Sequence, residues 1–185
     1  MSIAVSKTLA VARRQVNLFA LLMAWWLVAG GLHAATPRSS LVHKAAPAFV
    51  RKDLAGRRVA LRSYRGKVVL LNFWATWCGP CQVELPRFMQ WQNRYGSEGL
   101  QVIAVSMNDS DAPVRAWARK LNPNYPVMMG DARLGKLYGG VLGLPVTFLI
   151  GRDGKVETRI DGGADLPALE KMIQQLLGER RRGAR

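Results

Sequence analysis

The chain has 185 residues, of which 49% are hydrophobic and 21% are charged, and this composition predicts one ordinary globular domain with its own core. Two cysteines are too few for a scaffold stapled by disulfides. A formal net charge of +15 raises nucleic acids, anionic membranes and acidic proteins as candidate partners. The basic residues are scattered apart from a cluster at 180–185, and no nucleic-acid motif accompanies them. We therefore expect no nucleic-acid partner, and interpret the charge as a solvated basic surface or as weak steering of acidic partners.

The first 35 residues predict a targeting segment. Three basic residues precede an apolar stretch at 16–32, and small residues follow at Ala34 and Ala35. This pattern is typical of a cleaved signal peptide, but the apolar stretch is long enough to leave a retained membrane anchor open. Both alternatives place the domain in the periplasm or on the outer face of the bacterial cytoplasmic membrane. We expect a signal peptide or anchor at 1–35, a linker at 36–46, a folded domain at 47–178 and a basic tail at 179–185.

The apolar pattern after the linker predicts alternating strands and helices. In chain order we expect a hairpin at 49–53 and 59–61, a strand at 67–74, a helix at 79–95, a strand at 100–107, a helix at 112–121, a strand at 125–129, a short helix at 132–138, two paired strands at 146–150 and 155–160, and a helix from Asp165 to about Leu177. The strands at 67–74 and 100–107 are nearly continuous apolar runs, which indicates burial on both faces. The order predicts an α/β fold in which a central mixed sheet is flanked by helices on both faces, with an N-terminal hairpin extension.

Some boundaries have their own signals. Pro86 lies inside the helix at 79–95 and should kink it, unless the helix restarts there. Residues 108–111 offer helix N-caps, and Gly139 and Gly140 should end the short helix.

Both cysteines lie in the stretch NFWATWCGPCQVELP, at the junction of a buried strand and a helix. There the sulfur of Cys78 should face the free N–H groups and the positive end of the helix dipole, which favour thiolate and lower its pKa. Cys81, one turn later, can close a disulfide with Cys78. Trp74 and Trp77 can shield the pair, leaving Cys78 as the more accessible sulfur. Thiol–disulfide exchange needs this arrangement of one exposed attacking thiol and one shielded resolving thiol.

A pair of cysteines could also form half of a zinc site or a permanent structural disulfide. A zinc site needs about four ligands, but the histidines that could join the cysteines are His33 in the targeting segment and His43 in the linker. A permanent structural disulfide across so short a loop would constrain the unfolded chain little. We therefore predict a redox pair, with no metal and no cofactor.

Two stretches of the sequence resemble those of a known fold family. VVLLNFWATWCGPC and the later GLPVTFLI resemble thioredoxin-fold proteins. The phrase NFWATWC, the C-x-x-C-x-x-E spacing and the targeting segment make residues 46–177 most similar to the TlpA/ResA/CcmG family of membrane-associated thiol–disulfide reductases. The resemblance implies an extracytoplasmic thiol–disulfide oxidoreductase that reduces protein disulfides. Its implied partners are oxidised protein substrates, such as apocytochromes c or copper-site proteins in cytochrome c biogenesis, and a membrane electron donor of the thiol–disulfide interchange type.

The resemblance also assigns roles to residues. Cys78 matches the attacking cysteine, Cys81 the resolving one, and Pro145 the cis-proline that faces them. Leu144 would expose backbone groups that pair with an extended substrate. The alternative for Pro145 is an ordinary proline at the start of a strand. The residues expected to contact the substrate are Trp77, Gly79, Pro80, Leu144 and Pro145.

Glu84 matches the acidic residue of this family, three positions after Cys81. Its implied role is to accept the proton of Cys81; the alternative is a surface carboxylate near the helix start. Thioredoxins usually have an aspartate where this chain has Asn72, and an amide cannot take up a proton, which favours Glu84 in that role. Val146 is a second departure, because many relatives have threonine after the proline.

The dipeptide between the cysteines, Gly79-Pro80, is that of thioredoxin, whose potential of about −270 mV is that of a reductant. An oxidase with the same residues and a non-catalytic binding or chaperone module stay open as alternatives. A peroxidase of the peroxiredoxin kind shares the fold, but this chain lacks a separate peroxidatic cysteine.

Overall fold

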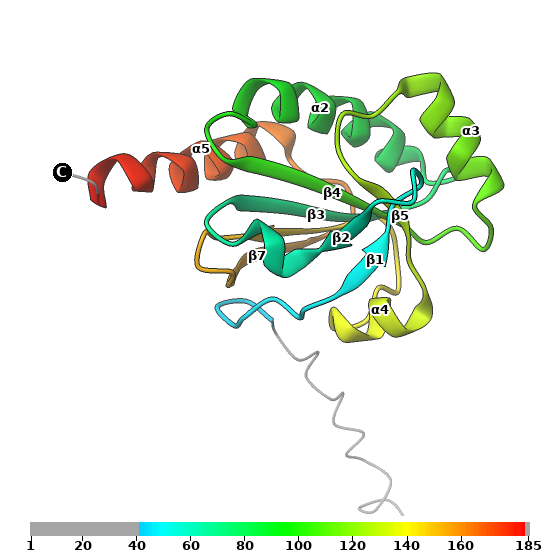
Figure 1. Cartoon of the computed structure of the whole chain (residues 1–185), viewed down its shortest axis with the longest axis horizontal. Coiled ribbons are helices and arrows are strands. Elements are labelled where there is room, and N and C mark those ends of the chain that lie inside the picture. The colour runs from blue at the N-terminus through cyan, green and yellow to red at the C-terminus, as the bar shows by residue number, and fades with distance from the viewer. Residues whose placement is uncertain (1–40, 184–185) are drawn as a thin grey trace, which may run out of the picture. The chain divides into compact units, whose positions relative to one another are not determined.

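The computed structural model describes residues 41–183 and confirms the predicted α/β fold (Figure 1). The predicted targeting segment lies outside the described residues. The elements in chain order are β1 (Val50–Lys52), β2 (Arg58–Ala60), the 3-10 helix η1 (Leu61–Tyr64), β3 (Val68–Trp74), α2 (Gly79–Tyr95), β4 (Leu100–Ser106), α3 (Ala112–Leu121), β5 (Val127–Met129), α4 (Ala132–Leu137), β6 (Val146–Ile150), β7 (Val156–Asp161) and α5 (Leu166–Gly183). Among residues 41–183, no helix combines the length and the apolar character needed to cross a membrane.

The central sheet has five strands in the order β5-β4-β3-β6-β7. Strands β3, β4 and β5 are parallel, whereas β6 and β7 are antiparallel to their neighbours. Because Trp74 lies opposite Ser106 and Phe73 lies opposite Val146, the ends of β3 and β4 and the beginning of β6 meet at one end of the sheet. The loops that follow β3 and β4 and the loop that precedes β6 therefore gather there.

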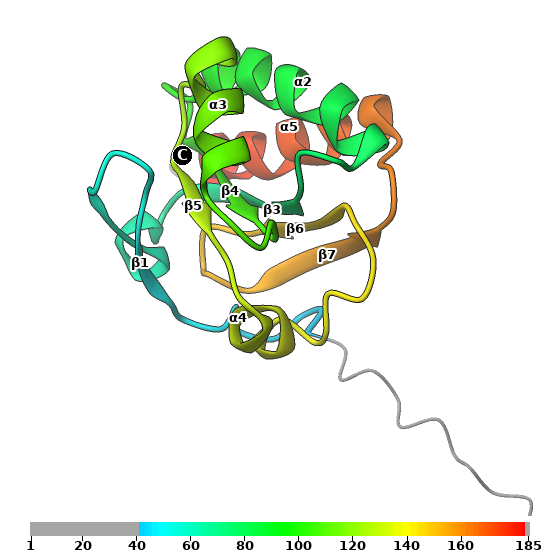
Figure 2. The same ribbon diagram turned by 90° about the vertical axis from the view of Figure 1, so that its right-hand side faces the viewer.

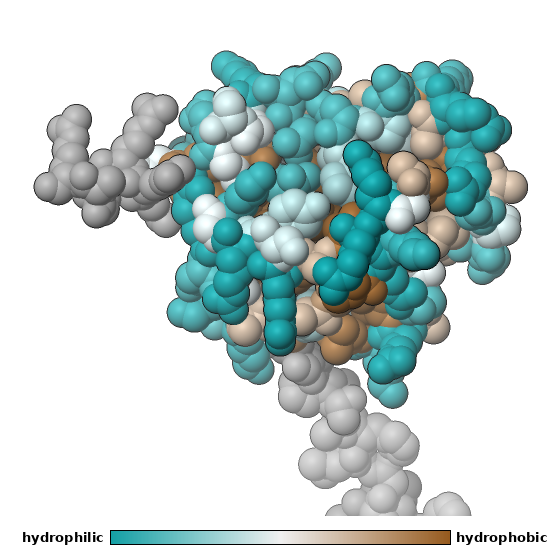
Figure 3. Space-filling view, viewed as in Figure 1, coloured by the Kyte–Doolittle hydropathy of each residue, from teal (hydrophilic) through white to brown (hydrophobic). Residues whose placement is uncertain are grey.

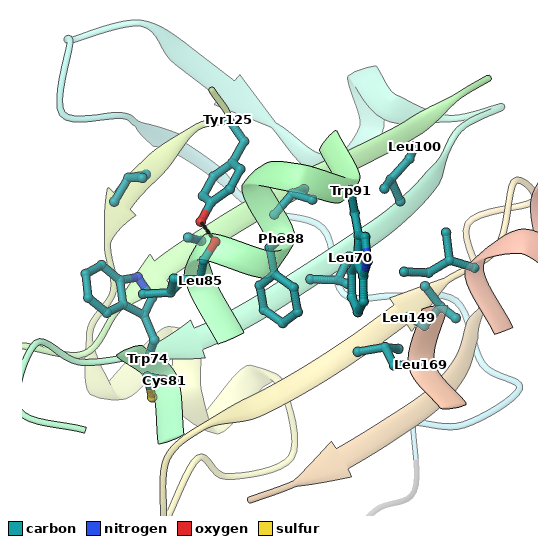
Figure 4. Packing of buried hydrophobic residues seen from close by; sticks show 14 of the residues in the cluster. Leu70, Trp74, Cys81, Leu85, Phe88, Trp91, Leu100, Tyr125, Leu149 and Leu169 are labelled. Atoms are coloured by element: carbon teal, nitrogen blue, oxygen red, sulfur yellow. Dashed lines mark hydrogen bonds between the residues drawn. The ribbon is translucent and has the colours of Figure 1, made fainter. Parts of the chain in front are cut away.

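Helices cover both faces of this sheet. Figures 1 and 2 show α2, α3 and α5 on one face and α4 on the other. Alternate residues of β3 serve the two layers: Leu70 and Trp74 join the core under α2, while Leu71 and Phe73 join the core on the α4 side. Figure 4 shows the core under α2, in which the Tyr125 hydroxyl donates to the backbone carbonyl of Leu85, 3.1 Å away.

The hairpin of β1 and β2 is a separate two-stranded sheet, as predicted. Its loop reaches the outer edge of β5, where the Leu54 N–H donates to the Val127 carbonyl at 2.8 Å. Helix α2 runs through Pro86 as one element, so the alternative of a restart at that residue is wrong.

Two predicted boundaries differ from the structure. Residues 41–46, predicted as part of the linker, pair with the outer edge of β7: the His43 N–H donates to the Val156 carbonyl, and the Val156 N–H donates to the Lys44 carbonyl. The free backbone groups of an edge strand supply these partners. Helix α5 continues past Leu177 to Gly183, because the Glu and Arg residues that follow favour helix.

Candidate functional site

The dithiol motif lies where β3 leads into α2. Cys78 is the N-cap residue of the helix, and its Sγ accepts a hydrogen bond from the Cys81 N–H at 3.3 Å. The two sulfurs are joined in a disulfide, with the Cα atoms 5.3 Å apart. The sulfur of Cys78 thus occupies the position that a capping oxygen takes in other helices, next to N–H groups without a helical partner. The predicted placement of Cys78 at a helix start is confirmed.

The surroundings make the two sulfurs unequal. Cys78 is 5% exposed and Cys81 is fully buried, which agrees with the predicted order of accessibility. Trp74 is fully buried, packs on the Trp117 ring with centroids 4.6 Å apart, and lies next to Cys81 in Figure 4. Trp77, in contrast, is 71% exposed. Trp74 therefore provides the shielding, and Trp77 remains available to a partner.

The loop between Trp74 and Cys78 is tied to the end of β4 by Asn108. The Asn108 Oδ1 accepts hydrogen bonds from the Thr76 N–H at 3.0 Å and from the Ser106 hydroxyl at 2.9 Å. Its Nδ2 donates to the Thr76 Oγ1 at 2.8 Å. One amide thus fixes the backbone two residues before the attacking cysteine.

Sequence reasoning considered residues 108–111 as helix caps and missed the role of Asn108. The N-cap of α3 is Asp111, and its side chain makes no capping bond but accepts from Arg115 Nε at 2.7 Å. A usable signal existed, because a polar residue directly after a parallel neighbour of the motif strand lies at the same end of the sheet.

The Leu144–Pro145 peptide bond is cis, as the resemblance implied. The Pro145 carbonyl accepts from the Gly162 N–H at 2.8 Å, which ties the start of β6 to the loop after β7. Among residues 41–183, neither backbone polar group of Leu144 has a hydrogen-bond partner. These groups meet the expectation for a strand-pairing edge, while substrate contact at Leu144 and Pro145 stays a prediction.

Glu84 is only 2% exposed, so the alternative of a surface carboxylate is wrong. Its Oε1 accepts from the Ala164 N–H at 2.7 Å, whereas its Oε2 is buried with no partner in the described part of the chain. Burial raises the pKa of the Glu84 carboxyl, and the Ala164 hydrogen bond partly opposes this rise. Glu84 is thus a buried acid one helical turn after Cys81, and its role as proton acceptor stays a prediction.

Asn72 is also fully buried, on the face of β3 that carries Leu70 and Trp74. Its Nδ2 donates to the Thr147 Oγ1 across the β3–β6 pair at 2.9 Å, and its Oδ1 has no partner within residues 41–183. The side chain therefore serves as a cross-strand link. Thr147 is the partner that sequence reasoning, which considered only Val146 after the proline, did not identify.

Arg159 of β7 holds the loop that leads to the cis bond. Its Nη1 donates to the Tyr138 carbonyl at 2.9 Å and its Nη2 to the Gly140 carbonyl at 2.8 Å. The guanidinium also pairs with Asp161 and lies over the Phe148 ring, 5.4 Å from the centroid. A single half-buried side chain thus holds the C-terminal end of α4 and Gly140, which precedes Leu144.

Comparison with known proteins identifies the family. Residues 42–159 match the family model described as AhpC/TSA. The chain belongs to the AhpC/TSA family. The thiol-disulfide oxidoreductase ResA of Bacillus thuringiensis subsp. konkukian (strain 97-27) is 35% identical over 136 residues, which are 73% of this chain and 78% of that protein.

Solved structures give the same result for the fold. The crystal structure of a putative thiol:disulfide interchange protein DsbE from Chlorobium tepidum matches with a TM-score of 0.68 and 36% identity, covering 72% of this chain and 96% of that one. The exposed lipoprotein thioredoxin Etrx1 of Streptococcus pneumoniae strain TIGR4 matches with a TM-score of 0.62 and 27% identity, covering 70% of this chain and 100% of that one.

This AhpC/TSA chain is a thiol–disulfide oxidoreductase with a thioredoxin-like fold, as its relatives and its dithiol motif indicate. Both of its cysteines are joined in the C-x-x-C disulfide, so neither is left as the separate peroxidatic cysteine of a peroxiredoxin. Within residues 41–183, no three His, Cys, Asp or Glu side chains come together in a way that could hold a metal ion.

Proposed function

We propose that the protein is an extracytoplasmic reductase of protein disulfides that works through the Cys78–Cys81 couple. The observation that carries the proposal is the Cys78 sulfur at the N-cap of α2, bonded to the Cys81 N–H. In the reduced protein, the Cys78 thiolate attacks one sulfur of a substrate disulfide, and the other substrate sulfur leaves as a thiol. The Cys81 thiolate then attacks the Cys78 sulfur, releases the second substrate thiol and closes the protein disulfide. Two electrons pass from the protein to the substrate.

Glu84 is proposed to accept the proton of Cys81 in the second step. Its burial, its raised pKa and its free Oε2 support this role, because such a carboxylate takes up a proton more readily than an exposed one. Asn72 cannot act in its place, since an amide side chain has no titratable proton in this range.

The substrate is proposed to lie across the exposed surface formed by Trp77, Gly79 and Pro80 and to pair with the free backbone groups of Leu144 beside Pro145. This arrangement would extend the β6 end of the sheet by strand addition. The exposure of Trp77 and the open backbone of Leu144 support it.

Electron flow towards the substrate is supported by Gly79-Pro80, the thioredoxin dipeptide. The segment at 1–35 supports a position in the periplasm or on the outer face of the cytoplasmic membrane, either free after cleavage or anchored. A reductant in that compartment needs a membrane electron donor. Oxidised apocytochromes c or copper-site proteins are the proposed substrate classes.

Three measurements test this function. Wild-type protein should reduce insulin, and absence of turnover would return the chain to a non-catalytic binding module. Cys78→Ser should abolish turnover, while Cys81→Ser should trap mixed disulfides with substrates; trapping by Cys78→Ser alone would reverse the two roles. The potential of the Cys78–Cys81 couple should lie near the thioredoxin value of about −270 mV, and a value near −120 mV would identify an oxidase instead.

A further inference from the structure

A cleft of about 530 Å³ lies between the hairpin loop after β1, the C-terminal half of α3 and the segment leading into β5. Figure 1 shows these three elements next to one another. The apolar side chains that line the cleft include Leu54, Pro123 and Val127, and its arginines are Arg57, Arg115 and Arg119. Neither cysteine lines it, so the cleft is separate from the dithiol site.

Two of the arginines are fixed by contacts inside the protein. Arg57 Nε donates to the Asp53 Oδ2 at 2.7 Å. Arg115 Nε donates to the Asp111 Oδ2 at 2.7 Å, and its Nη1 donates to the Leu54 carbonyl at 2.9 Å. A guanidinium held in this way loses less conformational freedom when it binds a ligand.

Each of the three arginines still has donors to offer. Within residues 41–183, neither the terminal nitrogens of Arg57 nor the Nη2 of Arg115 makes a hydrogen bond. Arg119 makes none there either, and it follows Arg115 by one turn on the same face of α3. The donors of all three side chains line one cleft, where a ligand with two acidic groups could engage more than one of them.

The only carboxylate that lines this cleft in the described part of the chain is Asp53. Asp53 is buried, and its oxygens already accept from Arg57 Nε and from the N–H groups of Ala55 and Arg57. Arg57 and Arg115 are paired with Asp53 and Asp111, so Arg119 supplies the unpaired positive charge of the cleft. The unused N–H donors of all three arginines line it together with Leu54, Pro123 and Val127, which we call the apolar floor.

We propose that this cleft binds an acidic segment of a protein partner, with carboxylate side chains on the arginines and an apolar side chain on the floor between them. Arginine donors match the paired oxygens of a carboxylate. A free inorganic anion would leave the apolar floor in contact with water, whereas a peptide with alternating acidic and apolar residues covers it. The proposal does not depend on the direction of electron flow at the dithiol.

The test uses the full oxidised protein and a fluorescein-labelled peptide of sequence ELEELE, with QLQQLQ as the neutral control. Fluorescence anisotropy should show binding of the acidic peptide and none of the neutral one, and the binding should weaken as salt is added. Arg119→Gln, which breaks no internal contact, and Arg115→Gln/Arg119→Gln should weaken binding, the double variant by about tenfold. The matched control is Arg87→Gln/Arg133→Gln, which removes the same charge from exposed positions outside the cleft.

Equal weakening in the matched control, or no binding by the wild type, would overturn the proposal in favour of diffuse surface attraction or of no site. Displacement of the peptide by inorganic phosphate at an equal concentration of charge would identify a small-anion site instead and would also overturn it. The reaction of each reduced variant with hydroxyethyl disulfide should stay at the wild-type rate, so a failure of the cleft and a failure of the dithiol chemistry are distinguishable.

Discussion

Asn108 joins the ends of β3 and β4 beside the dithiol, and we predict that Asn108→Ala uncouples them. The substitution removes the two hydrogen bonds that Oδ1 accepts and the one that Nδ2 donates. An intramolecular hydrogen bond contributes about 0.5–1.5 kcal/mol net, so three contribute about 1.5–4.5 kcal/mol. Because the Asn108 side chain is half-buried, water can hydrogen-bond to some of the groups that lose their partner. We therefore expect the free energy of unfolding to fall by about 1.5–3 kcal/mol.

The same substitution should slow the chemistry. Thr76 loses the contacts of both its backbone N–H and its hydroxyl with Asn108, and the loop that it holds leads directly to Cys78. A Cys78 sulfur that is less well placed over the helix N-terminus should attack more slowly, by about tenfold. Urea unfolding measures the stability, and stopped-flow reaction of the reduced protein with a peptide disulfide measures the rate.

Asn124→Ala is the matched control. The Asn124 Nδ2 donates to the Met89 carbonyl at 3.1 Å and to the Asn93 Oδ1 at 2.6 Å, in the second half of α2 and away from the dithiol. This variant should lose some stability and keep the wild-type rate. A wild-type rate in Asn108→Ala, or equal slowing in both variants, would refute the idea that the amide positions the attacking cysteine.

Three further predictions concern the buried groups. The pKa of Glu84 is raised in the folded protein, so its contribution to stability is complete below the pKa of the unfolded state and is lost as pH rises through the pKa of the folded state. The loss is about 1.4 kcal/mol for each pH unit between the two pKa values. Glu84→Gln should remove this pH dependence from the free energy of unfolding measured by urea titration from pH 4 to 9. Arg159→Gln should release the loop at Gly140, seen as faster amide hydrogen exchange there than in Arg133→Gln. Phe88→Ala, at a fully buried position, should lower the free energy of unfolding by about 3–5 kcal/mol.

Each of these three predictions would be contradicted by a specific result. Parallel pH profiles for wild type and Glu84→Gln would show that Glu84 titrates normally. Unchanged exchange at Gly140 would show that Arg159 does not hold the loop. A loss below about 1 kcal/mol at Phe88 would mean that the core under α2 collapses into the space.

The central elements were predictable because their signals are local. The continuous apolar run of β3 marks the length of the strand, and Gly79-Pro80 marks the first turn of α2, so the sequence predicts both boundaries. The disulfide partners were equally clear, since only two cysteines exist. The cis bond at Pro145 came from resemblance and not from any local signal, because the residues around a proline do not determine its isomer.

The remaining features depend on contacts between distant residues. The buried Glu84 carboxylate accepts from the N–H of Ala164, which lies 80 positions later in the chain, and no spacing around Glu84 predicts this contact. The hydrogen bonds between Asn108 and Thr76 depend on the parallel register of β3 and β4. The stretch at 41–46 lies between Pro37 and Pro47 and contains small residues, which is typical of a linker. Its backbone instead pairs with β7, which offers it hydrogen-bond partners. Figure 3 shows hydrophilic residues over most of one face of the molecule. The cleft beside α3 is lined by residues that lie far apart in sequence, such as Leu54 and Arg119, so no local pattern predicts it.

Both outer strands of the central sheet, β5 and β7, have their outer edges paired with other segments of the chain. The edge of β5 is covered by the hairpin loop at Leu54, and the edge of β7 is covered by residues 42–45. Exposed strand edges invite pairing between copies of a chain and lead to aggregation. The N-terminal part of the domain thus occupies both of these edges. Shortening the chain to remove residues 41–45 should therefore expose β7 and make the protein prone to form intermolecular sheets, while the dithiol stays intact.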